Sequence, residues 1–251
     1  MMRGRARPPG RAGGSPGWLA PAGCVLVALA MRVWAHAHQP YVTVDGTEYI
    51  RFAESLMRGE AFASIFPPGY PALVALARLV VPDRILAAAI VSIVSGALLP
   101  LPVWWLARRS LGERLAVLPA LAVALHPDLA RISSVALSEA PYFLALYTGL
   151  ALATRPLLSG LILGAAFAVR PEGLLCTAGL AVLQGSRVVR RAATPRTLVT
   201  CVAGFLLLAT PCWLYFRLTL GEWTVTPKVV ALRAAATEWR PQEPRLADSS
   251  R

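Results

Sequence analysis

Long apolar runs separated by short arginine-bearing connectors limit the folds open to this chain more than any other feature. Residues 157–168 and 197–213 are two such runs. A helix needs roughly 20 mostly apolar residues to cross a bilayer. Hydrophobic residues make up 56% of the chain and charged residues only 15%, whereas charged residues are about 25% of an ordinary soluble domain. The sequence therefore predicts an all-α polytopic membrane protein.

The apolar segments predict about seven membrane-spanning helices. They cover residues 18–36, 84–106, 115–125, 140–153, 157–169, 173–183 and 197–218. Several are short enough to need flanking residues to complete a crossing. Residues 68–82 are too short for a crossing, and we expect them to form a helix at the outer edge of the membrane. Gly160 and Gly164 have a spacing that lets helix backbones approach closely, so we expect them to serve packing.

Composition divides the chain into three parts. Residues 1–17 are rich in Arg, Pro and Gly, and we expect a disordered cytoplasmic tail. Residues 18–218 form the predicted membrane module, whose first outer loop covers residues 37–70. Residues 219–251 are expected to form a polar outer tail.

The arginine residues predict the orientation of the helices. The chain has 24 Arg and one Lys against 13 acidic residues, a net charge of +12. The first tail and the connectors at 108–114, 155 and 187–196 hold 12 of these Arg. Because short basic loops stay on the cytoplasmic side, we expect the N-terminus inside and most carboxylates outside the cell (inner or plasma) membrane. Arg32 lies within the first span, and we expect it to extend to the interface or to contact a phosphate.

Several partner classes are disfavoured. The Arg residues do not alternate with aromatic residues along a polar face, so we expect no nucleic acid. The four Cys lie in apolar runs without C-x-x-C spacing. His36 and His38 form only an H-x-H pair, so we predict no metal site, and dependence on a divalent metal stays open. The chain has no Walker loop, G-x-S-x-G or Rossmann glycine pattern.

A group of motifs follows the first span. Asp45 and Tyr49 stand four residues apart, an A-x-x-L-x-x-G pattern covers 53–59, and Pro-Pro-Gly-Tyr-Pro follows at 67–71. This arrangement resembles the lipid-linked-sugar glycosyltransferases of the GT-C fold, in the branch that includes aminoarabinose transferases and protein O-mannosyltransferases. The first-loop pattern is moderately specific for that family.

The resemblance covers about residues 18–228, with further agreement at 138–139 and 160–173. It implies a GT-C-like bundle of transmembrane helices with a structured first outer loop. It also implies a glycosyltransferase that moves a sugar from a polyprenyl-phosphate donor to a lipid, glycan or protein acceptor on the outer face. The expected partners are the lipid-linked sugar and membrane lipid.

Full-length relatives usually continue through further spans, so we expect this chain to be a truncated, N-terminal catalytic part. A second membrane polypeptide could complete it. A non-catalytic membrane subunit or a relic of such an enzyme is the first alternative. A polytopic permease is less favoured, because permeases place charged groups near the bilayer midplane, whereas the charges of this chain lie at the span ends.

The resemblance implies two catalytic carboxylates. Sugar transfer needs a base or charge-orienting group for the acceptor hydroxyl, and Asp45 fits that role. Its structural alternative is to cap a helix that begins near Thr47. Glu139 competes with Asp128 for the role of second carboxylate, and we favour Glu139. The structural alternative for Glu139 is an ion pair with Arg131.

Four residues are predicted to bind substrate. Arg170 suits a phosphate because its planar guanidinium donates two hydrogen bonds at once, and Glu172 stands beside it; a purely structural pair of the two is the alternative. Tyr49 and Tyr70 complete the set, and packing at the interface is an equal alternative for Tyr49. In many relatives a Lys or Arg precedes the double proline, but Phe66 stands there in this chain, which removes one usual phosphate contact.

Overall fold

The computed structural model describes residues 17–38, 41–192 and 194–238, and this part of the chain has helices but no strands. The prediction of an all-α fold is thus confirmed. The predicted tail at 1–17 lies outside the described residues except for Gly17, and so do residues 239–251. The helices are α1 (Leu19–His38), α2 (Val44–Met57), α3 (Gly69–Arg78), α4 (Arg84–Leu98), α5 (Pro100–Leu115), α6 (Val117–Leu125), α7 (Pro127–Ile132), α8 (Glu139–Ala151), α9 (Pro156–Val169), α10 (Gly173–Val189), α11 (Pro195–Leu220) and α12 (Pro227–Glu238).

Within the described residues, three helical segments are long and apolar enough to cross a membrane. They are α1, α4 with its continuation α5, and α11, which supports a membrane protein. Helices α9 and α10 are apolar but shorter, and α6 has nine residues, so a count of seven crossings stays a prediction. Helix α3 has ten residues and is about 15 Å long, which confirms that residues 68–82 form no crossing helix.

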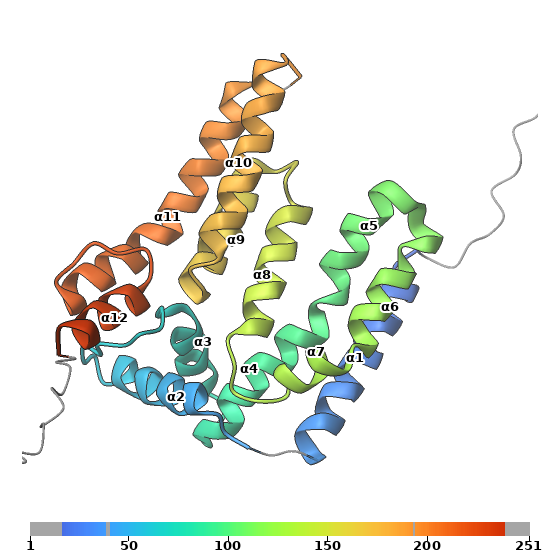
Figure 1. Ribbon diagram of the computed structural model, residues 1–251. Helices are drawn as coiled ribbons and strands as arrows, with labels where there is room; N and C mark the ends of the chain where they lie inside the picture. Colours follow the sequence, from blue (N-terminus) through green and yellow to red (C-terminus); the bar gives the residue numbers. More distant parts are fainter. Residues whose placement is uncertain (1–16, 39–40, 193, 239–251) are drawn as a thin grey trace, which may run out of the picture.

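The long helices run between two ends of the molecule (Figure 1). One end carries the last part of α5, the turn from α8 to α9 and the ends of α10 and α11 that face each other, and the arginine-rich segments 108–114, 155 and 187–196 fall there. Helices α2, α3 and α12 lie at the opposite end, where α8 begins and α9 ends. The connectors that the sequence assigns to one side therefore gather at one end of the bundle.

Helices α9 and α11 pack backbone against backbone through glycine. A Cβ atom added to Gly164 would lie 2.6 Å from the carbonyl oxygen of Phe205, and one added to Gly204 would lie 2.5 Å from that of Leu157. A Cβ on Gly160 would collide with the carbonyl of Cys201. Such close approach is what small residues permit in membrane helices. The predicted packing role of Gly160 and Gly164 is confirmed.

Arg32 does not extend to an interface. Its side chain is 0% exposed and donates to the carbonyl of Ala28 in its own helix and to those of Val123 and Ala124 near the end of α6. The last carbonyls of a helix have no partner within the helix and attract cations. Arg32 thus caps α6, and both expectations for it, exposure at the interface and contact with a phosphate, are wrong.

Candidate functional site

A cavity lies at the end of the molecule that holds α2 and α12. It is bordered by the start of α2, the loop before α3, the start of α8, the connection from α9 to α10 and the start of α12. Residues that are far apart in the sequence therefore meet around it, including five of the six predicted site residues. Its polar lining residues are Asp45, Tyr49, Ser138, Glu139, Arg170, Glu172 and Lys228.

The start of α2 places Asp45 and Tyr49. Thr43 precedes the helix, and its hydroxyl oxygen accepts a hydrogen bond of 2.9 Å from the backbone nitrogen of Gly46. Asp45 lies in the first turn, where the helix dipole stabilises negative charge, and Tyr49 follows one turn later on the same face. Thr43 is the cap, so the alternative of Asp45 as a cap is wrong. Asp45 is exposed and has no hydrogen-bond or ion-pair partner within the described residues.

Helix ends place the other charged groups. Glu139 lies in the first turn of α8. Arg170 follows the last residue of α9 in an extended conformation, and Glu172 directly precedes α10. A Cβ atom on Gly173 would lie 2.6 Å from the backbone nitrogen of Phe167, so this glycine permits the tight connection that directs Arg170 into the cavity.

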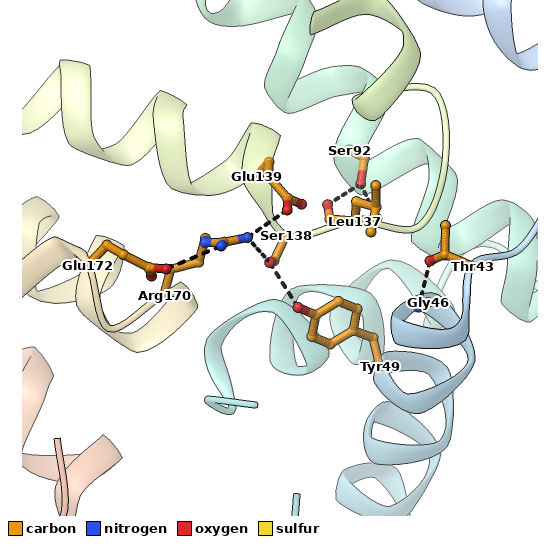
Figure 2. Close-up of polar contacts among 9 residues, drawn as sticks. All are labelled: Thr43, Gly46, Tyr49, Ser92, Leu137, Ser138, Glu139, Arg170 and Glu172. Atoms are coloured by element: carbon orange, nitrogen blue, oxygen red, sulfur yellow. Dashed lines mark hydrogen bonds and ion pairs between the residues drawn. The ribbon is translucent and has the colours of Figure 1, made fainter. Parts of the chain in front are cut away.

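Arg170 lies between two carboxylates (Figure 2). Its guanidinium contacts Glu139 at 2.7 Å and Glu172 at 3.2 Å, so the structural pair with Glu172 exists and is extended to Glu139. Burial lowers the pKa of Arg170, but the two carboxylates outweigh burial and leave the pKa above its ordinary value. Burial raises the pKa of Glu172. A hydrogen bond from its backbone N–H and the charges of Arg170 and Lys228 lower this pKa by more, so it lies below its ordinary value.

Tyr49 packs in the core and also borders the cavity. Its side chain is 3% exposed, and its ring contacts those of Phe66 and Tyr70, with centroid distances of 4.6 and 4.8 Å. Its hydroxyl group lies 2.9 Å from the hydroxyl oxygen of Ser138, which in turn accepts a hydrogen bond of 3.4 Å from Arg170. Burial raises the pKa of Tyr49 to about 12, so the phenol stays protonated at neutral pH.

Of the two candidates for the second carboxylate, Glu139 lines the cavity together with Asp45, whereas Asp128 does not. Asp128 contacts Arg131 at 3.7 Å on exposed α7, so the alternative pairing of Glu139 with Arg131 is wrong. One oxygen of Glu139 accepts from Arg170. The other oxygen is buried and has no hydrogen-bond partner within the described residues.

Tyr70 does not line the cavity, so the prediction that it contacts substrate is wrong. Its side chain is 0% exposed. Its hydroxyl donates to the carbonyl of Ala88 at 3.0 Å and lies 3.0 Å from the hydroxyl of Ser92. Ser92 donates at 2.8 Å to the carbonyl of Leu137, directly before Ser138. Tyr70 therefore positions the loop that carries the site.

The sequence patterns did not predict that Ser138 links Tyr49 to Arg170 or that Lys228 lines the cavity. The ammonium of Lys228 lies 5.4 Å from the ring centre of Phe66. Lys228 is the only lysine of the chain, and this could have singled it out in the sequence. Its distance from Phe66 along the chain hides the connection, because only the fold brings the start of α12 to the loop before α3.

The chain was compared with known proteins. No family model matches it, and no curated protein or solved structure matches it significantly. Within the described residues, no group of three or more His, Cys, Asp or Glu side chains is arranged to hold a metal ion. Any function is therefore argued from the cavity itself.

Proposed function

We propose that this chain is a glycosyltransferase of the GT-C type, which moves a sugar from a polyprenyl-phosphate donor to a hydroxyl group of a lipid, glycan or protein. The observation that carries the proposal is the meeting of two carboxylates, Asp45 and Glu139, with the guanidinium of Arg170 around one cavity. These groups are the base, the orienting acid and the cation that such a transfer needs.

The proposed orientation places the N-terminus in the cytoplasm and the cavity on the outer face of the cell membrane. The arginine-rich turns at the opposite end of the bundle support it (Figure 1), because short basic connectors favour the cytoplasmic side. A donor with an apolar tail reaches such a cavity from the bilayer, and α1, α4 with α5, and α11 are long enough to lie in one.

In the proposed reaction Asp45 is the base. It takes the proton of the acceptor hydroxyl as the hydroxyl oxygen bonds to the anomeric carbon of the sugar. The bond between that carbon and the phosphate oxygen breaks, and polyprenyl phosphate leaves with the electron pair. Arg170 balances the charge on the phosphate. Asp45 suits its role because it is exposed and forms no ion pair with any described residue, and Arg170 because Glu139 and Glu172 fix its plane.

The free oxygen of Glu139 supports a role toward a hydroxyl group. A buried polar atom without a hydrogen bond costs about 1–3 kcal/mol, and more when it is charged. A hydroxyl group of the bound sugar would donate to this oxygen and offset that cost. We therefore assign Glu139 to orient the donor sugar while it also holds Arg170.

Two adjoining cavities give the substrates room. The cavity beside Arg170 measures about 60 Å³, far less than a small-molecule site, so it fits the reacting groups and not a whole sugar. A larger cavity of about 460 Å³ adjoins it, and Asp45, Ile65 and Phe66 line both. Ligand sites of roughly 300–1,000 Å³ hold small molecules, so a sugar fits the larger cavity with Asp45 at its edge.

The test is sugar transfer by the purified chain in lipid, with a radiolabelled polyprenyl-phosphate sugar as donor. Asp45→Asn keeps the shape of the side chain but removes the base, and transfer should fall by about 10²- to 10⁴-fold. Asp128→Asn is the matched control, because Asp128 is also an exposed acid at a helix start but lies outside the cavity. Equal transfer by Asp45→Asn and Asp128→Asn would refute the proposal.

A further inference from the structure

One cation of the cavity, Lys228, forms no ion pair within the described residues. Glu139 and Glu172 both contact Arg170, so two carboxylates share its guanidinium with any ligand. Lys228 has no carboxylate oxygen within 4.0 Å among the described residues, although it lines the same cavity. Its charge acts on Glu172 from a distance, but no carboxylate of the described residues occupies the hydrogen-bonding positions of the ammonium, so these stay available to a ligand.

The surroundings hold Lys228 toward the cavity. It is the second residue of α12, directly after Pro227, and its ammonium lies 5.4 Å from the ring centre of Phe66. A cation near an aromatic face is attracted to it by about 0.5–1 kcal/mol at exposed sites. An aromatic partner orients a cation without neutralising it, whereas a carboxylate would compete with an anionic ligand. Phe66 thus keeps the ammonium at the cavity and leaves it free.

We infer that Lys228 binds the phosphate of a lipid phosphate and thereby makes α12 part of the substrate site. An ammonium is a compact charge that suits phosphate oxygens, and the cavity lies at the end of helices long enough to cross a membrane. The inference rests on the proposed function for the identity of the lipid, a polyprenyl chain. Lys228 holds the phosphate from the α12 side, and Arg170 holds it from the α9 side.

The experiment measures binding of farnesyl phosphate and of its neutral counterpart farnesol to the purified full chain in detergent. Lys228→Ala should weaken binding of farnesyl phosphate by roughly 10- to 100-fold, the worth of a charge-assisted hydrogen bond, and leave binding of farnesol unchanged. Lys228→Arg should keep most of the preference for the phosphate. Arg233→Ala is the matched control, because Arg233 is a cation of the same helix that contacts Glu222 and is 73% exposed. It should bind both ligands like the wild type.

Three results of the binding experiment would overturn the inference. The first is unchanged affinity of Lys228→Ala for farnesyl phosphate, and the second is an equal loss for farnesyl phosphate and farnesol, which would mean that the variant disturbs α12. The third is displacement of farnesyl phosphate by inorganic phosphate at equal concentration, which would identify a soluble anion as the ligand. A selective loss in a chain that transfers no sugar would refute only the glycosyltransferase, and full transfer by Lys228→Ala would refute only the role of Lys228.

Discussion

Replacement of Gly204 by alanine tests the packing that supports the site. Gly204 lies on α11 against the backbone of α9, and an added Cβ would lie 2.5 Å from the carbonyl oxygen of Leu157 and 3.0 Å from the backbone nitrogen of Leu161. Both neighbours are backbone atoms of a helix, so neither can rotate away. The two helices must separate by about 0.9 Å to restore an ordinary contact of 3.4 Å.

The cost follows from that separation. A gap of about 0.5–1 Å removes a quarter to a half of the dispersion energy of each facing contact, and overpacking costs about 1–3 kcal/mol in well-packed cores. Alanine also gains about 1 kcal/mol over glycine in a helix, which would hide part of the loss. Gly179→Ala on α10 measures this gain alone, because an added Cβ there has nothing within 4 Å. The difference between Gly204→Ala and Gly179→Ala therefore isolates the overpacking cost.

The assay uses the cysteines of the chain. Cys24, Cys201 and Cys212 are buried and unpaired, so a thiol-reactive fluorogenic dye reports unfolding in detergent on heating. A change of 1 kcal/mol shifts Tm by roughly 2–4 °C in a chain of this size. Gly204→Ala should thus unfold about 2–12 °C below Gly179→Ala. Equal Tm values would refute the close contact of α9 and α11.

The other predictions concern the cavity. Arg170→Lys keeps the charge but loses the planar fork, so donor KM should rise while Tm stays within a few degrees; an unchanged KM would remove Arg170 from the phosphate site. Tyr49→Phe removes the hydroxyl bond to Ser138, and the free energy of unfolding should fall by about 0.5–1.5 kcal/mol; no loss would contradict that bond. Because the pKa of Glu172 lies below its ordinary value of 4.5, its stabilising effect is present above pH 4.5 and is lost as the pH falls through the lowered pKa. Glu172→Gln should flatten this acid limb of the stability profile, and an unchanged limb would assign it to other groups.

The sequence predicted the helices and much of the cavity because two signals are local. Apolar runs of helical length mark the helices, and the acidic and basic residues that break those runs, such as Asp45, Glu139 and Arg170, fall at their ends. Neighbouring antiparallel helices place alternate ends at the same level, so residues of this kind meet at one end. The predicted membrane side of each helix end therefore also placed the cavity residues on one side.

Three features escaped prediction because they depend on tertiary contacts. Thr43 takes the capping position that was considered for Asp45, and the register of a helix start is fixed within one turn only by its hydrogen bonds. Arg32 is drawn inside by the free carbonyls of α6, which no pattern near Arg32 shows. Lys228 belongs to a segment that composition marks as a polar tail, and its contact with Phe66 joins residues from opposite halves of the chain.

Neighbouring residues of the Pro-Pro-Gly-Tyr-Pro segment contact two different parts of the site, which composition cannot show. A Cβ atom on Gly69 would collide with the carbonyl of Ala168, so the glycine lets α3 press against the end of α9, two residues before Arg170. Tyr70 is bonded to Ser92, which holds the carbonyl of Leu137 two residues before Glu139. One short segment therefore fixes both members of the Arg170 and Glu139 ion pair through their backbone neighbours, and its Pro67 lines the cavity. In the proposed enzyme Asp45 is the base, and this segment accompanies it because it sets the distance at which Glu139 and Arg170 stand.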